Sequence, residues 1–314
     1  SRIIMKKFVN TLMVLLSIFI TTNSLLSCEK VNVEKKDKDM GKVIVYISFS
    51  DFNYSFDEEE IATRASDKTP DEADVNRIAL SVFDTNGKLV FESTKNESVD
   101  VDDFSQISCA LLPGDYSFVV VAHKANDNEN PAIISSVDKA TITTAKLLKS
   151  FAVNQSVTVI ADQANYVTID LGKRISSQFM LKVLDDQPAE VAWCEIILNP
   201  TVSATTDYVF NPNTGFAFES YQYKNEFPRS GMKGETFKEK LLGLHCLVTE
   251  NPQKVNVTIN MKDASGNVVK SRTLTDVPMA PHRVTRATGN FFDSSTKTNF
   301  LFDTEDDPVY DISL

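Results

Sequence analysis

The sequence has few of the residues and motifs on which catalytic and metal-binding sites depend. Its 314 residues include one Trp, three His and four Cys. The His residues are too far apart to show metal-ligand spacing. There is no GxSxG, HExxH, Walker, GxGxxG or EF-hand motif. The acidic runs at 57–60 and 303–307 lack the glycine-centred alternation of a calcium loop. These absences argue against an enzyme and predict neither a cofactor nor a metal site.

The chain has fewer basic than acidic residues, with 32 Lys and Arg against 43 Asp and Glu. Its formal net charge is −11 at pH 7. A chain this acidic repels phosphate backbones and anionic head groups. Nucleic acid is therefore excluded as an expected partner.

The N-terminal residues have the pattern of a secretory signal that ends in a lipidation site. Lys6 and Lys7 precede an apolar run over residues 8–26, as in a signal peptide. The run ends in LLSC, which resembles a bacterial lipobox with Cys28 as the acylated residue. We predict a lipoprotein signal peptide at 1–27, acyl chains such as palmitate on Cys28, and a polar tether at 28–41. The alternative is an ordinary signal, or a transmembrane helix, followed by a chance cysteine. No later apolar run approaches the ~18 residues that span a bilayer.

Three cysteines remain when Cys28 is set aside, namely Cys109, Cys194 and Cys246. Their number is odd and no pair has CxxC spacing. Each lies in an apolar, strand-like segment, so we predict buried free thiols. One disulfide and one free thiol is the alternative.

Short alternating segments separated by turn residues fill the rest of the chain. The first, at 42–49, places Val43, Val45, Ile47 and Phe49 on one face. Turns are expected at 84–87, 113–114 and 263–267, with a hairpin at each of the first two, and one helical patch is expected at 144–152. Further strands are expected at 77–84, 88–92, 106–112, 116–122, 166–171, 177–184, 191–198, 254–262, 268–274, 282–292 and 299–303. This pattern predicts an all-β protein with two β-sandwich domains, at 42–163 and 164–314.

Six features follow one another along the chain. They are the lipobox at Cys28, the strand at 43–49, Thr-Arg-Ala at 63–65 after an acidic loop, ALLPGDYSFVVVA at 110–122, VTIDL at 167–171 with Lys-Arg at 173–174, and HRVTRATGNFF at 282–292. Each motif alone shows little more than a β-strand pattern. In this order they resemble one family, the fimbrillins, which are type V pilus subunits of Bacteroidales and share an LPxGxYxFxxxA motif similar to that at 110–122. The resemblance covers nearly the whole chain after the signal.

The resemblance implies two tandem transthyretin-like β-sandwiches in a structural or adhesive subunit of a fimbrium. It implies delivery to the cell outer membrane as a lipoprotein held through Cys28, in a surface-exposed pilus. It further implies that an arginine-directed protease cuts between Arg64 and Ala65. The strand bearing Val43, Val45, Ile47 and Phe49 would then leave, and a strand of another fimbrial subunit would fill its groove. A host or bacterial surface ligand is an expected further partner.

The C-terminal residues offer two candidate donor strands. Tyr310, Ile312 and Leu314 alternate with polar residues, and Phe300 and Phe302 lie in an earlier apolar segment. The chain ends soon after Phe302, whereas stalk subunits of the family carry a long extension, so an accessory, tip or anchor subunit is favoured. The alternatives are a permanent strand at 43–49, an ordinary surface arginine at Arg64 and a simple edge strand at the C-terminus.

A second function remains open from the sequence, namely a glycan-binding surface lipoprotein of tandem β-sandwiches. Such sites stack sugars on aromatic side chains. Trp193 is the only Trp, and Tyr221, Tyr223 and Phe227 lie in the turn-rich region 199–234. These three residues are the expected platform under this alternative.

Overall fold

The structure is a computed structural model that describes residues 40–48, 75–101, 103–172, 174–293 and 309–313, the last with backbone only. Strands dominate this part of the chain. Its helical residues form two single-turn 3-10 helices, η3 (Arg229–Gly231) and η4 (Lys233–Glu235). None of its helices has the length and apolar character needed to cross a membrane.

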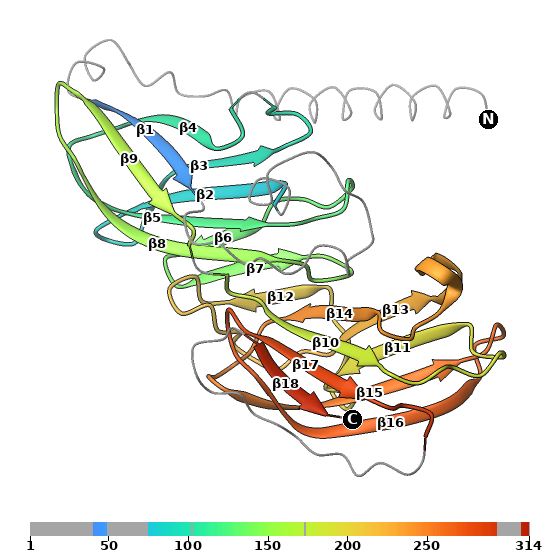
Figure 1. The fold of residues 1–314 in the computed structure, drawn as a ribbon. Helices are drawn as coiled ribbons and strands as arrows, with labels where there is room; N and C mark the ends of the chain where they lie inside the picture. Colours follow the sequence, from blue (N-terminus) through green and yellow to red (C-terminus); the bar gives the residue numbers. More distant parts are fainter. Residues whose placement is uncertain (1–39, 49–74, 102, 173, 294–308, 314) are drawn as a thin grey trace, which may run out of the picture. The chain divides into compact units, whose positions relative to one another are not determined.

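Sheets A and B face each other across a shared apolar core (Figure 1). Sheet A has the order β4 (Gln106–Leu111), β1 (Gly41–Ser48) and β9 (Ala164–Asp170). Sheet B has the order β3 (Leu89–Asn96), β2 (Arg77–Asp84), β5 (Gly114–His123) and β8 (Ser150–Val159). The core contains Val43 and Val45 from sheet A, and Leu80 and Phe118 from sheet B. Alternation along each strand directs these side chains into the space between the sheets.

Sheet C covers the other face of sheet B. Its order is β12 (Asp207–Phe210), β7 (Lys139–Thr143) and β6 (Ile133–Ser136). Phe83 and Val119 of sheet B share one buried cluster with Ile134 and Ile142 of sheet C. Because both faces of β2 are covered, seven of its eight residues are buried. This accounts for the five apolar residues of its sequence, RIALSVFD, which lie on both faces of the strand.

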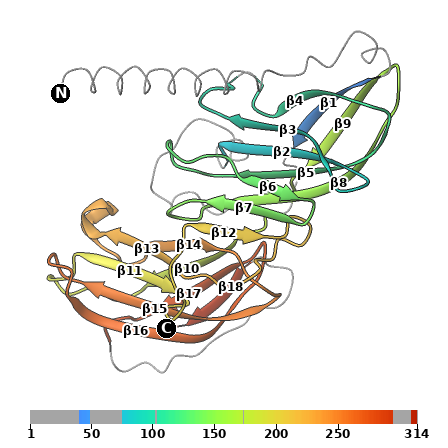
Figure 2. The same cartoon turned by 180° about the vertical axis from the view of Figure 1, so that it is seen from behind.

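Sheets D and E enclose the apolar core of the C-terminal half (Figure 2). Sheet D has the order β14 (Leu241–Cys246), β10 (Ser177–Val183), β17 (Val284–Gly289) and β18 (Val309–Ser313). Sheet E has the order β13 (Tyr223–Pro228), β11 (Trp193–Leu198), β15 (Gln253–Lys262) and β16 (Val268–Met279). Phe179 and Leu181 of β10 pack with Ile196 and Ile259 of sheet E in this core. The predicted all-β class with facing sheets is therefore confirmed.

Two predicted turns are confirmed and one predicted hairpin is wrong. The 84–87 turn joins β2 to β3, with Gly87 at φ +75° and its N–H donating to the Asp84 carbonyl at 2.9 Å. The 263–267 turn joins β15 to β16, with Gly266 at φ +85°. The turn at 113–114 instead leads from β4 in sheet A to β5 in sheet B. The chain crosses between the two layers there, so these strands do not pair.

The helical patch predicted at 144–152 is also wrong. Residues 144–149 form an irregular connection, and β8 begins at Ser150. Pairing with the whole length of β5 holds residues 150–152 in the extended form. Tertiary pairing thus overrides the local apolar spacing.

Strand pairings cross the predicted boundary between residues 163 and 164. β9, at 164–170, pairs with β1, and β12 pairs with β7 from the N-terminal half. The two-domain division and its transthyretin-like detail stay a prediction. The pairings show that sheets A and C each contain strands from both sides of that boundary.

Candidate functional site: the slot that holds β1

β1 is the middle strand of sheet A and buries one face along its length. Val43 and Val45 are fully buried and Ile47 is 5% exposed. On the opposite face Lys42 and Tyr46 are exposed, and Ile44 between them is covered. The alternation of GKVIVYIS explains this orientation. The inward face is the one that the sequence predicted. Phe49, its fourth expected member, lies outside the described residues.

Glycine is required where β1 begins. A Cβ added at Gly41 would lie 2.7 Å from the Ile160 carbonyl oxygen and 2.8 Å from Asn165 Nδ2. Both distances are shorter than real Cβ contacts. The close approach lets the start of β1 lie against the β8–β9 connection.

Both edges of β1 are paired, in opposite senses. It runs antiparallel to β4, with Val43 opposite Cys109, and parallel to β9, with Val45 opposite Val167. Beyond the β1–β4 register, the Ile47 N–H donates to the Ser105 carbonyl at 2.9 Å. Within the described chain, β1 is the only neighbour of β4 and of β9 in sheet A. Loss of β1 would therefore leave two facing strand edges unpaired.

The burial of β1 corresponds to a substantial free energy. On the inward face alone, three large apolar side chains are removed from water, at about 1.5–3 kcal/mol each. Their sum is roughly 5–9 kcal/mol, before the main-chain pairing on both sides. The same amount would become available to any strand that fills the slot with similar side chains.

Cys109 lies beside the slot, on the neighbouring strand β4 and opposite Val43. It belongs to the same core cluster as Val43 and is 9% exposed. Burial raises the pKa of its thiol from 9.0 to about 11. Cys194 and Cys246 are buried in the C-terminal core, and burial raises the pKa of the Cys246 thiol to about 12. All three are free, as the sequence predicted.

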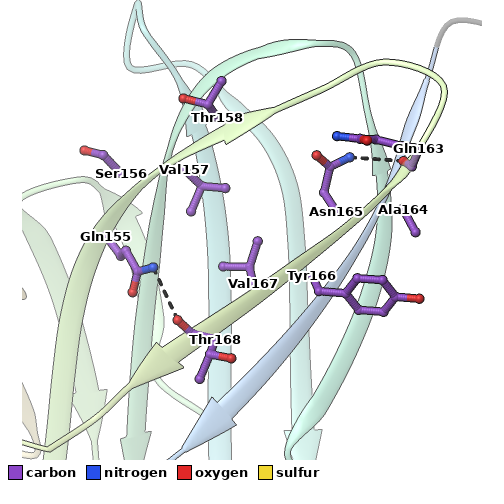
Figure 3. Close-up of a pocket in the computed structure, with 10 residues that line it drawn as sticks. All are labelled: Gln155, Ser156, Val157, Thr158, Gln163, Ala164, Asn165, Tyr166, Val167 and Thr168. Atoms are coloured by element: carbon purple, nitrogen blue, oxygen red, sulfur yellow. Dashed lines mark hydrogen bonds between the residues drawn. The ribbon is translucent and has the colours of Figure 1, made fainter.

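A surface groove of about 400 Å³ follows the edge of β9 that faces away from β1. It runs between β8 and β9, and Val157 and Val167 lie between the two strands (Figure 3). The Gln155 amide donates from Nε2 to the Thr168 carbonyl oxygen at 3.3 Å. The groove therefore adjoins the strand that pairs with β1.

Asn165 ties the end of this groove to β1. Its Nδ2 donates to the carbonyl oxygens of Ile160 at 3.0 Å, Gln163 at 3.2 Å and Lys42 at 3.4 Å. Its Oδ1 accepts from the Ile160 N–H at 2.9 Å. One buried amide thus fixes the β8–β9 turn and contacts the backbone of β1.

The candidate donor segment at the C-terminus is paired within its own chain. The backbone of β18 runs parallel to β17, with Tyr310 opposite Thr285 and Ile312 opposite Ala287. β17 is its neighbour in sheet D, so β18 is an edge strand of the described sheet. Its donation to another subunit stays a prediction.

Six other predicted site residues lie outside the described part of the chain. They are Cys28, Arg64, Ala65, Phe300, Phe302 and Leu314. Lipidation of Cys28, cleavage after Arg64 and donation by the segment with Phe300 and Phe302 therefore stay predictions.

The aromatic platform expected for glycan binding is wrong. Tyr221 and Tyr223 are 4% and 3% exposed and pack with Tyr208 in the core. Tyr223 stacks on Tyr208 with ring centroids 5.2 Å apart, and its hydroxyl donates to the Leu247 carbonyl. Phe227 is half-buried against the same core. Tyr223 lies at the start of β13, whose alternation directs its side chain into the core, whereas this region was expected to be a loop.

Sequence reasoning missed two exposed tyrosines on sheet A, Tyr46 and Tyr166, which are 40% and 68% exposed. Burial alternates strictly along ANYVTID, which directs Tyr166 away from the core. The parallel pairing of β9 with β1 had no local signal. Among the described residues, no group of three or more His, Cys, Asp or Glu side chains could hold a metal ion.

Comparison with known proteins gives partial similarities to solved structures and one match to a family profile. Solved structures with a similar fold include the fimbrial anchor protein Mfa2 from Porphyromonas gingivalis, at 14% identity and TM-score 0.44, covering 75% of this chain and 83% of that one. A protein from Bacteroides ovatus described as an adhesin has 13% identity and TM-score 0.47, covering 78% and 79%. A protein from Bacteroides thetaiotaomicron VPI-5482 described as polysaccharide-binding has 15% identity and TM-score 0.47, covering 74% and 79%.

No curated protein matches the chain in sequence. The profile of one protein family does match, over residues 55–191, and its description is "Major fimbrial subunit protein (FimA)". This range begins in the predicted processing loop and includes the LPGDYSFVVVA segment of β5. The predicted resemblance is thereby confirmed: the chain is similar, over residues 55–191, to the FimA family of major fimbrial subunit proteins.

Proposed function

We propose that this protein is a fimbrial subunit, exported as an outer-membrane lipoprotein and assembled with other subunits by β-strand donation. The family match supports a fimbrial or adhesive role, and a structural rather than catalytic one. The observation that carries the assembly mechanism is the position of β1. This first strand is buried between β4 and β9 and is followed in sequence by the segment that contains Arg64.

Chain order makes β1 separable. It ends at Ser48, β2 begins at Arg77, and Arg64 lies between them in sequence. A cut after Arg64 would leave β1 attached to the rest of the fold by non-covalent contacts alone. The roughly 5–9 kcal/mol of apolar burial and the two strand edges would then be open to competition from another strand.

The proposed route has three stages. Acylation of Cys28 holds the subunit at the outer membrane, with more than one acyl chain needed for stable anchoring. Cleavage between Arg64 and Ala65 then frees β1. A strand from a neighbouring subunit enters the slot, and the segments with Tyr310, Ile312 and Leu314 or with Phe300 and Phe302 are the candidates for donation.

Limited digestion with an arginine-specific protease tests this proposal. We expect one early cut, a new N-terminus at Ala65, and a ladder of oligomers on SDS gels run without boiling. Arg64→Lys keeps the charge but removes the cleavage site, so this variant should stay uncut at residue 64 and monomeric.

A competition experiment tests the slot itself. A synthetic peptide of residues 41–49, added in excess after cleavage, should suppress the ladder because it refills the slot. The same peptide with aspartate in place of Val45 is the matched control and should not suppress it. A cut chain that remains monomeric, or a ladder that neither peptide affects, would contradict strand donation into this slot.

A further inference from the structure

The groove between β8 and β9 has an unusual set of lining side chains. Ten residues line it, and its polar side chains are three amides and three hydroxyls together with Tyr166 (Figure 3). The amides are Gln155, Gln163 and Asn165, and the hydroxyls are Ser156, Thr158 and Thr168. The volume of about 400 Å³ falls within the range of small-molecule sites, about 300–1,000 Å³.

The lining carries no charge. None of the ten lining residues is Asp, Glu, Lys, Arg or His, although 24% of the chain is charged. The nearby carboxylate of Asp115 accepts a hydrogen bond from the Thr158 hydroxyl at 2.6 Å, so it would repel an anion that finds no cationic side chain in the lining. One carboxylate alone supplies too few oxygen ligands for a metal cation. A lipid would find too little apolar surface, because the aliphatic side chains are Val157, Val167 and Ala164 alone. The ligand class that fits this lining is a neutral molecule with many hydrogen-bonding groups.

Amides and hydroxyls suit sugar hydroxyls in particular. A sugar hydroxyl both donates and accepts, and so do the side chains of Asn, Gln, Ser and Thr. Gln155 uses one N–H for the Thr168 carbonyl and still carries a second N–H and its Oε1 oxygen. Asn165 is 9% exposed and has both ends of its amide bonded, so it fixes the wall of the groove. The groove is therefore shaped before a ligand arrives.

The same hydrogen bonds leave less room for an added β-strand. An incoming strand would pair with the free backbone groups at the edge of β9. On β9 itself, the Gln155 amide already donates to the Thr168 carbonyl. Asn165 bonds the N–H and the carbonyl of Ile160, which lies in the connection between β8 and β9.

An aromatic surface borders the groove. Tyr166 is 68% exposed, and its ring points away from Val157 and towards the β1 side of β9 (Figure 3). Tyr46 on β1 is 40% exposed and lies on the same face of sheet A. It is opposite Thr168, two residues after Tyr166 on β9, so the two tyrosines are diagonal neighbours. Diagonal neighbours on adjacent strands are about 7–8 Å apart. Sugar rings have an apolar C–H face that packs on such aromatic rings, while their hydroxyl edge seeks polar partners.

We propose that the groove between β8 and β9, together with the Tyr166 and Tyr46 surface beside it, binds a neutral oligosaccharide. The amides and hydroxyls contact the sugar hydroxyls, and the tyrosine rings carry the sugar faces. This site differs from the strand slot and goes beyond the assembly role, so it stands or falls separately from strand donation.

Isothermal titration calorimetry of the full chain tests the site. The probes are maltohexaose, cellohexaose and xylohexaose, with the anionic polymer polygalacturonate as a charged comparison. At least one neutral probe should bind, and polygalacturonate should not. Tyr166→Ala and Gln155→Ala should each weaken that binding about tenfold. Phe218→Ala is the matched control, because Phe218 is 58% exposed and lies outside the groove. It should bind as the parent chain does.

Circular dichroism spectra and urea midpoints must match between the variants, so that lost binding is not lost folding. The proposal is overturned if no neutral probe binds at millimolar concentration. It is also overturned if Tyr166→Ala and Gln155→Ala bind like the parent chain, or if an extended peptide occupies the groove and no glycan does. Oligomer formation after cleavage at Arg64 is measured in a separate experiment. A failure of glycan binding therefore does not count against strand donation, and a failure of strand donation does not count against glycan binding.

Discussion

Cys109 offers a direct chemical measure of whether β1 leaves its slot. With β1 in place the thiol is buried and its pKa is about 11, against an ordinary 9.0. Burial disfavours the charged thiolate, so exposure of Cys109 should lower the pKa towards 9.0. At pH 8 a fall of two pKa units raises the thiolate fraction about 100-fold. Steric access to the reagent improves at the same time.

The perturbation is cleavage after Arg64 followed by removal of the β1 fragment on a column under mild urea. The assay is iodoacetamide labelling at pH 8, with the rate at each cysteine read by peptide mass spectrometry. We expect Cys109 labelling to accelerate on the order of 100-fold. Cys194 and Cys246 serve as internal references, because they belong to the C-terminal core and contact none of β1.

Two results would refute this reasoning. Slow labelling of Cys109 after the fragment is gone would mean that the slot closes without β1. Equal acceleration at all three cysteines would mean that the whole chain unfolds. Addition of the 41–49 peptide should slow Cys109 again, which separates a reversible open slot from chemical damage.

Three further predictions concern stability. Val45→Ala should lower the free energy of unfolding by about 2 kcal/mol through lost burial and a cavity, whereas Tyr46→Ala on the exposed face should change it by less than about 0.5 kcal/mol, as read from urea titrations. Burial would raise the pKa of Glu195, but hydrogen bonds from Lys224, Lys262 and Asn260 outweigh it and lower the pKa to about 2. A lowered carboxyl pKa contributes stability that is present above pH 4.5 and is lost as the pH falls towards 2. In Glu195→Gln the free energy of unfolding should therefore fall less over this pH range than in the parent chain, by on the order of 2 kcal/mol, as read from urea titrations at each pH. Arg77 is 2% exposed and donates to the carbonyls of Asn126, Asp127 and Glu129. Arg77→Lys should therefore lower the free energy of unfolding by about 2–4 kcal/mol, seen as a lower thermal midpoint. An unchanged midpoint would show that those carbonyls find other partners.

Local pattern was sufficient to predict the strands that alternate strongly or end in a glycine turn. GKVIVYIS and QKVNVTINMK both form strands, and the inward face predicted for Val43, Val45 and Ile47 is buried. Asn86-Gly87 marks a real hairpin, because the turn needs a positive φ that glycine adopts freely. These features depend on neighbours in sequence, so the sequence alone could reveal them.

Features that depend on distant partners could not be predicted in this way. The region 199–234 was expected to be a loop, yet it contains β12 and β13, which pair with β7 and β11. The turn at 113–114 has hairpin chemistry, yet it separates two sheets. The β8–β9 groove joins two segments whose polar side chains are unremarkable until their strands lie side by side. Which strands pair with each other depends on the whole fold and not on the local sequence.

The mixed pairing of β1 has a consequence for the polarity of any replacement strand. β4 and β9 run in opposite directions, because β1 is antiparallel to one and parallel to the other. A strand entering from either end would therefore meet one parallel and one antiparallel neighbour. Ladder geometry alone does not discriminate between head-first and tail-first entry. The order of side-chain sizes along the incoming strand must decide the direction in which subunits follow one another.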